Sequence, residues 1–329
     1  MTLKEILQEK ISNALTPLID QDYILLDLPY HSNLGDLLIW EGEKDYLARL
    51  PHKCLRYSDL NTFSFPELSP HTIILLHGGG NFGDLWPTHQ CFRQEVIKRY
   101  PANRIVLFPQ SVWYNDKSLI KRDVEIMSRH KNLYLCARDR WSYDFMKEHF
   151  NSNEVLLLPD MAFCIDNNKL VPYIGKEIHG RRLYVKRLDK ELDTVTLLNV
   201  AKDVEIRDWP TIEKNSSYFA ILSKMIGAHR LSGKIRFPSL TGKMINLYAD
   251  KIIRPYALKT ACEFLAPYEQ IVTTRLHVLI LSVLLHKPCS YIDNTSGKLS
   301  AFASTWLSTL EDVKQMNDER YSLFANGKE

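Results

Sequence analysis

The chain lacks any hydrophobic run long enough to cross a membrane. A transmembrane helix needs about 20 consecutive apolar residues, whereas the longest run in this sequence, VLILSVLL, extends only from Val278 to Leu285. We interpret that run as a buried helix. The N-terminal segment MTLKEILQEKISNALTPLI is typical of an amphipathic helix with charges inside it, not of a signal peptide. These two features predict a cytoplasmic protein.

Paired cysteines and an excess of charge are also missing. The six cysteines are scattered, without a CxxC pair or a histidine at ligand spacing, which predicts buried free thiols in a reducing compartment and no metal site. The formal net charge is only +3, and no segment alternates basic with aromatic residues. The composition therefore argues against a nucleic-acid partner.

Apolar strands alternate with helical patterns along much of the chain. Because near-continuous apolar strands are typical of a parallel sheet covered on both faces, the pattern predicts an α/β fold. With 329 residues the chain exceeds the usual size of one domain, so we expect two. In the first half, strands are expected at residues 23–28, 72–78, 104–110, 132–139 and 154–160, and helices at 37–50 and 117–129.

We expect two Rossmann-like domains that face each other across a cleft. The segment 167–180 carries Pro172, Gly175 and Gly180 and is predicted to be a linker. The N-terminal domain then covers residues 1–166, and the C-terminal domain covers residues 181–329, beginning with a strand at 181–189. In parallel sheets, ligands bind beyond the carboxyl ends of the strands, where this sequence places polar residues.

The segment HGGGNFGD follows one of these strands and holds Gly78, Gly79 and Gly80. It has neither the GxGxxG spacing of a dinucleotide loop nor a P-loop pattern, and no GxSxG nucleophile elbow occurs in the chain. Consecutive glycines permit positive φ and close backbone approach, and their N–H groups can form an anion-binding nest. A tight turn is the alternative, but three glycines followed by Gly83 favour a ligand.

Two further motifs contain groups that could take part in catalysis. In HSNLGD, Asp36 is expected either to cap a helix starting at Leu37 or to act in catalysis, and both readings stay open. In VTTRLHV, an apolar strand is expected to present Arg275 and His277 on one face, at the start of an apolar helix. A guanidinium and an imidazole there would form an anion site with a proton donor. The alternative is a structural ion pair for Arg275 and a helix cap for His277.

Six segments together make the chain resemble the polysaccharide pyruvyl transferase family. They are HSNLGD, LLHGGGNFGDLW, FPQSVWY, CARDRWS, LLPDMAF and TTRLHVLILSVLLHKPCSYIDNTSGKLSAF, in order and with similar spacing. The resemblance implies two Rossmann-like domains arranged as in GT-B glycosyltransferases. It also implies transfer of pyruvate from phosphoenolpyruvate to galactose, mannose or an N-acetylhexosamine, as a cyclic ketal in a bacterial exopolysaccharide or capsule.

The resemblance also suggests roles for individual residues. Arg275 would hold the donor and His277 would act as acid or base, while Asp36 and His31 would orient or deprotonate the acceptor. No cofactor is expected, since phosphoenolpyruvate is itself a substrate. No metal is expected either, since no histidines, aspartates or cysteines are clustered at ligand spacing. The other residues expected to bind substrate are Asn33, Gly35, Gly78, Gly79, Gly80, Asn81, Arg138 and Arg187.

Two other functions are considered. One is a glycosyltransferase that uses a nucleotide sugar, and the other is a non-catalytic binding protein for polysaccharide assembly. The stretch from Ile221 to Lys259 carries eight lysines or arginines and one acid, Asp250, interleaved with apolar residues. It could be an ordinary solvated surface. If the acceptor is lipid-linked rather than a free oligosaccharide, this stretch could contact an anionic membrane peripherally, at its inner face.

Overall fold

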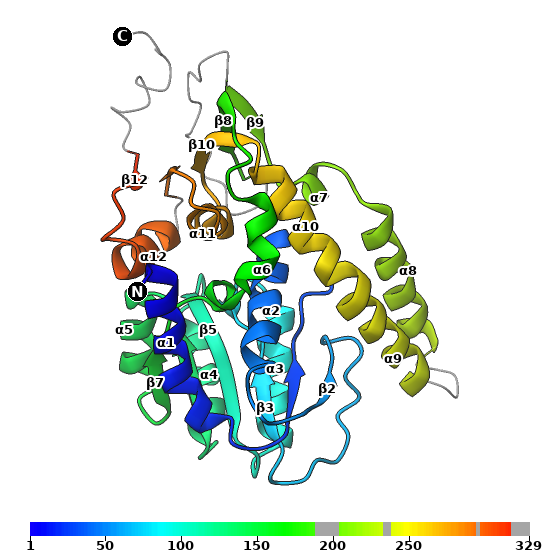
Figure 1. Cartoon of the computed structure of the whole chain (residues 1–329). Helices are drawn as coiled ribbons and strands as arrows, with labels where there is room; N and C mark the ends of the chain where they lie inside the picture. Colours follow the sequence, from blue (N-terminus) through cyan, green and yellow to red (C-terminus); the bar gives the residue numbers. More distant parts are fainter. Residues whose placement is uncertain (188–203, 233–237, 294–296, 317–329) are drawn as a thin grey trace. The chain divides into compact units, whose positions relative to one another are not determined.

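The computed structural model describes residues 1–187, 204–232, 238–293 and 297–316 (Figure 1). The chain divides into two compact units. The first comprises residues 1–32, 36–165 and 215–256, and the second comprises 33–35, 166–214 and 257–329. None of the helices in the described ranges is long and apolar enough to span a membrane.

The first unit is built on a parallel sheet with the strand order β2-β1-β3-β5-β6-β7, in which β4 pairs with β5. Its inner strands are short apolar runs such as YILL and IILL, whose residues are all buried. The predicted strands are therefore confirmed, most with earlier ends. The strands are β1 (Tyr23–Leu26), β2 (Cys54–Tyr57), β3 (Ile73–Leu76), β4 (Gly79–Gly83), β5 (Ile105–Trp113), β6 (Leu133–Ala137) and β7 (Glu154–Leu157).

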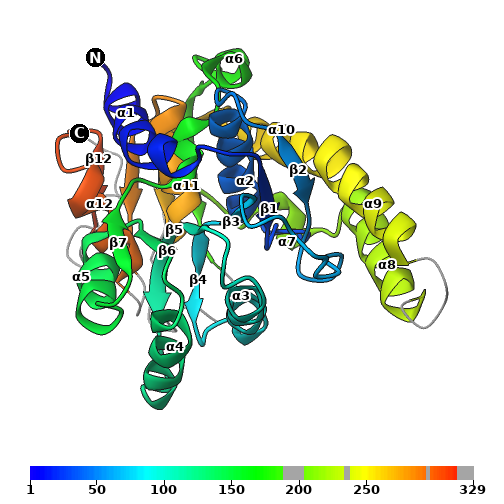
Figure 2. The ribbon, with the colours of Figure 1, turned by 90° about the horizontal axis from the view of Figure 1, so that it is seen from below.

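Helices cover both faces of this sheet (Figure 2). From β1 the strand order runs outward in both directions, and right-handed crossovers then place the connecting helices on opposite faces. Helices α1 and α2 lie on one face, and α3, α4 and α5 lie on the other. These helices are α1 (Leu3–Leu15), α2 (Leu34–Leu47), α3 (Pro87–Arg99), α4 (Ser118–Ser128) and α5 (Arg140–His149).

The second unit contains another parallel sheet, with the order β12-β11-β10-β8-β9. Its strands are β8 (Ile178–Val185), β9 (Val204–Arg207), β10 (Tyr268–Thr273), β11 (Cys289–Tyr291) and β12 (Val313–Gln315). The helices are α6 (Asn167–Leu170), α7 (Pro210–Glu213), α11 (Leu276–Leu284) and α12 (Lys298–Trp306), and α10 (Arg254–Leu265) enters from the first unit. Two mixed α/β units with parallel sheets confirm the α/β class predicted from the sequence.

The predicted linker at 167–180 was wrong, because the segment is folded. Its first residues form α6, which Asp166 caps by accepting from the Asn168 N–H at 2.9 Å. Its last residues begin β8, where the Gly180 N–H donates to Glu269 at 2.7 Å. Strand β8 ends at Val185, and residues 188–189 of the predicted strand lie outside the described residues.

The structure also differs from the predicted domains at residues 215–256, which belong to the first unit. This segment holds α8 (Ser217–Ser232), α9 (Pro238–Tyr248) and the π-helical turn Ala249–Ile253. The side-chain oxygen of buried Asn246 on α9 accepts from the Tyr30 hydroxyl at 3.1 Å and the Thr62 hydroxyl at 2.8 Å. Its amide donates to Ser58 at 3.2 Å. These contacts join residues 184 to 216 positions apart in the sequence, so local patterns could not predict them.

We expect Asn246→Ala to lower the free energy of unfolding of the first unit by about 1–3 kcal/mol, because it leaves the buried hydroxyl of Tyr30 without its acceptor. The substitution should lower the urea midpoint followed by circular dichroism. Lys243→Ala, on the exposed side of the same helix, is the control and should change stability by less than about 0.5 kcal/mol. Equal midpoints for the two variants would contradict the account of how α9 is held.

Candidate functional site

The first group of candidate residues lies where β1 and β3 end. The strand order changes direction between these neighbours, and ligands in open α/β sheets bind at such switch points. Asp27 directly follows β1 and has a φ of 65°, a backbone conformation uncommon for residues other than glycine. His77 directly follows β3, and the glycine strand β4 begins two residues later.

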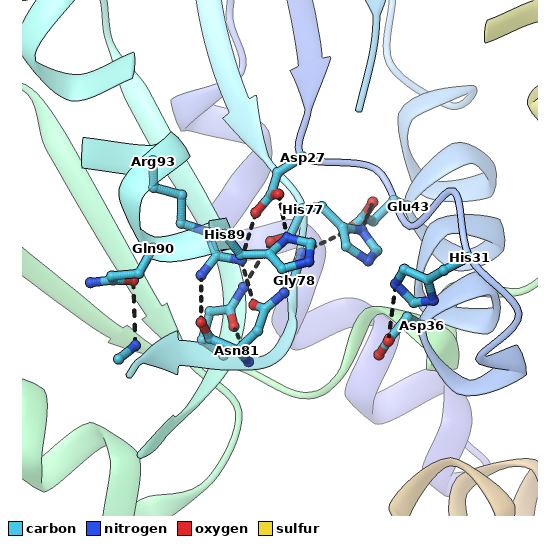
Figure 3. A network of polar contacts seen from close by, with 12 residues as sticks. Asp27, His31, Asp36, Glu43, His77, Gly78, Asn81, His89, Gln90 and Arg93 are labelled. Carbon is cyan, nitrogen blue, oxygen red and sulfur yellow. Dashed lines mark hydrogen bonds and ion pairs between the residues drawn. The ribbon is translucent and has the colours of Figure 1, made fainter. Parts of the chain in front are cut away.

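Asp27 is fully buried and contacts two basic side chains of α3 (Figure 3). Its carboxylate lies 2.7 Å from Nδ1 of His89 and 2.7 Å from the guanidinium of Arg93. Burial by itself raises the pKa of Asp27, but Arg93 and His89 more than reverse this effect, so the pKa is lowered. Asp27 is therefore a buried carboxylate anion.

A buried histidine–glutamate pair lies beside it. The Nδ1 atom of His77 is 2.8 Å from Oε2 of Glu43, and Oε1 of Glu43 accepts from the Gly78 N–H at 2.9 Å. Burial tends to lower the pKa of His77, but the Glu43 carboxylate outweighs it and the pKa is raised. Among the described residues, Nε2 of His77 has no hydrogen-bond partner.

His31 and Asp36 form the more accessible pair in this group, with side chains 42% and 26% exposed. Their Nε2 and Oδ2 atoms are 3.6 Å apart (Figure 3). The predicted cap at Asp36 was wrong, because α2 begins at Leu34 and not at Leu37. The Asn33 side chain caps it instead, accepting from the Gly35 N–H at 3.2 Å. Asp36 lies in the first turn, so its carboxylate is available to His31.

The glycine segment lies against its own sheet, which corrects the predicted anion-binding nest. Three of its N–H groups already donate to side chains: Gly78 to Glu43, Asn81 to Gln110 and Gly83 to Gln90. A Cβ on Gly83 would lie 1.9 Å from the carbonyl oxygen of Trp113 on β5. Gly79 has a φ of 132°. The close approach that Gly83 permits is therefore to the protein backbone, whereas Gly79 is required for its positive φ.

Two of the expected substrate residues are engaged internally. Asn81 accepts from buried Arg93 through both its side-chain oxygen and its backbone carbonyl. Arg138 is buried, and it donates to Ser111 at 2.9 Å and to Asp160 at 2.9 Å. Side chains of β5 and of the segments after β6 and β7 therefore meet at one edge of the sheet.

The second group lies where β8 and β10 end, which is the corresponding switch point of the second sheet. Arg275 binds both oxygens of Asp208, with NH2 to Oδ2 at 2.6 Å, and both side chains are buried. This is the structural ion pair that the sequence left as an alternative. The Arg187 N–H donates to Thr274 at 2.8 Å, which places Arg187 next to this turn.

Arg275 and His277 do not share a strand face, contrary to the prediction. Strand β10 ends at Thr273, whose hydroxyl accepts from the Arg275 N–H at 2.8 Å and turns the chain. Arg275 is the N-cap residue of α11, and His277 lies in its first turn. His277 is also close to Gly35, because a Cβ on Gly35 would lie 2.5 Å from its Nδ1 atom. The need for glycine at position 35 is therefore steric.

Sequence reasoning did not single out the partners of these groups. Asp27 and His77 could have been found, since each is a polar residue directly after an apolar strand. The remaining partners lie on α2 or α3, or directly after β9, and no local sequence pattern marks them as functional. They are Glu43, His89, Arg93 and Asp208.

The chain belongs to the polysaccharide pyruvyl transferase family, whose model matches residues 33–296. It is 33% identical to EpsO of Bacillus subtilis (strain 168), provisionally named a pyruvyl transferase, over 94% of this chain and 92% of that protein. It is 30% identical to pyruvyl transferase 1 of Schizosaccharomyces pombe over 89% and 72% of the two chains. The protein is accordingly a polysaccharide pyruvyltransferase, an enzyme that transfers pyruvate in polysaccharide biosynthesis.

The fold has a counterpart among solved structures. A functionally uncharacterised protein from Klebsiella pneumoniae subsp. pneumoniae superposes with a TM-score of 0.65, covering 96% of this chain and all of the other. The two sequences are 17% identical, so this likeness concerns the fold alone.

We expect Asp208→Ala to lower the free energy of unfolding by about 3–5 kcal/mol, because it leaves the buried guanidinium of Arg275 without its counter-charge. The double variant Asp208→Leu with Arg275→Met should lose much less stability than Asp208→Ala, since it removes both charges together. Thermal unfolding of the two variants and the wild type measures this. A double variant at least as unstable as Asp208→Ala would show that the ion pair is not what stabilises this turn.

Proposed function

We propose that the enzyme transfers pyruvate from phosphoenolpyruvate to a hexose as a cyclic ketal, with its two domains facing across a cleft. The hexose is galactose, mannose or an N-acetylhexosamine of a bacterial exopolysaccharide or capsule. Two acceptor hydroxyls bond to C2 of the donor, the methylene carbon gains a proton, and the C2–O bond to phosphate breaks. One hydroxyl proton balances the new methyl group, and the other balances the departing phosphate.

The observation that carries this proposal is the turn at the head of α11. It combines a guanidinium, an imidazole and the positive end of a helix dipole at a switch point. Phosphoenolpyruvate carries a carboxylate and a phosphate, which require such groups. In this proposal Arg275 and Arg187 hold the donor, and Asp208 keeps Arg275 oriented. The ion pair of Arg138 with Asp160 supports a structural role for Arg138.

Proton transfer is assigned to two histidines. His277 would protonate the methylene carbon of the donor, since imidazole is well suited to this near neutral pH. His31, oriented by Asp36, would accept a proton from an acceptor hydroxyl, because this pair is partly exposed. In this proposal Asn33 and Gly35 position the start of α2, and Gly80 and Asn81, which are partly exposed, would line the acceptor side, whereas Gly78 and Gly79 are buried.

The direct test is product analysis. Purified enzyme is incubated with phosphoenolpyruvate and a panel of nucleotide sugars, lipid-linked sugars and free oligosaccharides. The proposal requires phosphate release matched by an acceptor that gains a pyruvyl ketal in mass spectrometry. Transfer of the sugar from a nucleotide sugar, with phosphoenolpyruvate unchanged, would make the enzyme a glycosyltransferase instead.

We predict that His277→Gln lowers turnover roughly 100-fold or more, because it removes the proton donor. Binding of phosphoenolpyruvate, measured by calorimetry, should change much less. His130→Gln is the matched control, since His130 is also buried but its Nε2 atom is bonded to the Tyr100 carbonyl at 3.0 Å. Near-normal turnover in His277→Gln would assign the catalytic proton to another group.

We also propose that the basic stretch containing α9 contacts an anionic membrane peripherally, at the inner face of the membrane. On α9, Leu240, Met244 and Leu247 are each more than half exposed at helical spacing, and Lys243 is exposed among them. A soluble helix rarely keeps a continuous apolar stripe in water, and flanking lysines suit anionic lipid headgroups. Lys234 and Arg236 of the basic stretch lie outside the described residues.

Wild-type protein should therefore co-sediment with phosphatidylserine vesicles at low salt and less so at high salt. Replacing Leu240, Met244 and Leu247 with serine should abolish this binding while leaving the circular dichroism spectrum unchanged, because these side chains are exposed. Equal, negligible sedimentation of the wild type with anionic and neutral vesicles would reduce the stripe to a solvated surface.

A further inference from the structure

Trp141 lies at the edge of the first sheet where the parallel strands end, and its side chain is half-exposed to solvent. It is the second residue of α5, which begins shortly after β6 ends at Ala137. Arg138 and Asp139, between the strand and the helix, are buried, whereas Trp141 is 50% exposed. The chain thus turns outward at the edge where parallel sheets bind ligands, and nothing described above uses this ring.

The ring is the outer member of a stack of three. Trp141 stacks on Phe145 with ring centroids 5.6 Å apart and planes at 25°, and Phe145 stacks on Tyr114 at 5.8 Å and 22°. The Tyr114 hydroxyl donates to the buried carboxylate of Asp123 at 2.9 Å, which fixes the inner end. Trp141 is therefore held in place before any ligand arrives, so binding against it costs little side-chain entropy.

Stabilisation of α5 alone does not account for the position of Trp141. Aromatic pairs at i and i+4 do stabilise a helix, but that benefit does not require a large ring half exposed at a functional edge. Polar side chains lie next to Trp141 along α5: Arg140 and Asp144 are exposed and 3.9 Å apart, with the Arg140 guanidinium over the ring of Tyr143. An exposed indole ring with polar side chains near it is complementary to a molecule that has one apolar face and polar groups around its edge.

We propose that Trp141 is a stacking platform for a pyranose ring of the acceptor saccharide, adjacent to the sugar that receives pyruvate. A pyranose has a face of C–H groups, which packs against the negative face of an aromatic ring, and a rim of hydroxyls. Arg140 and Asp144 supply donors and acceptors for that rim. The choice of a sugar rests on the proposed function, and it makes an oligosaccharide a better acceptor than a monosaccharide.

The test uses the full-length protein and galactose, mannose and N-acetylglucosamine saccharides of one to three residues. The indole N–H signal of Trp141, assigned by its absence in Trp141→Phe, should shift with di- or trisaccharides. Trp141→Ala should weaken binding of the longer saccharides roughly three- to tenfold, with monosaccharide binding unchanged. Trp141→Phe should retain most of the affinity. Trp86→Ala, which removes a ring of similar exposure (42%) at the start of α3, should leave affinity unchanged.

Two results would overturn the inference. One is an indole signal that does not respond to any of these saccharides, and the other is a Trp141→Ala protein whose affinities match those of Trp86→Ala at every length. Either result would leave the proposed function standing if wild-type enzyme still forms a pyruvyl ketal. Conversely, a Trp141 response without any pyruvylated product would support the platform and reject the proposed reaction.

Discussion

Charge that is removed from water must be compensated, and this constraint shapes both sheet edges. Asp27 lies against Arg93 and His89, Glu43 against His77, and Asp208 against Arg275. An unpaired charge in these buried positions would cost several kcal/mol, about as much as a large part of a domain's stability. The pairs therefore fix where the strands end and how the following turns run.

The same pairing distinguishes the groups that hold the chain in place from the groups to which the proposed reaction assigns proton transfer. Glu43 holds Nδ1 of His77 and the N–H of Gly78, so the start of the glycine segment is tied to α2. His31 and Asp36 are partly exposed at the same switch point. In the second unit Asp208 orients Arg275 at the N-cap, and His277 lies in the first turn of α11. The proposed pyruvyl transfer requires charged groups and proton donors that are already in position before the reaction begins.

The parts of this structure that depend on local pattern could be predicted from the sequence. Runs such as IILL at β3 predict their strands directly, and the motifs at strand ends predict where polar side chains gather at the sheet edge. Contacts between distant residues could not be predicted. The pairing of Arg275 with Asp208 spans 67 residues, and the fit of Gly83 against Trp113 depends on the register of two strands. The glycines suggested a ligand because the sequence cannot distinguish a ligand close to the backbone from another part of the protein close to it.

The central claim is that the enzyme protonates the methylene carbon of phosphoenolpyruvate and forms a ketal at C2. Running the reaction in D2O and examining the product methyl group by NMR and mass spectrometry tests it most directly. The account predicts a methyl group that carries one deuterium from solvent for each phosphate released. A product methyl without deuterium, or phosphate release without a pyruvylated acceptor, would contradict it.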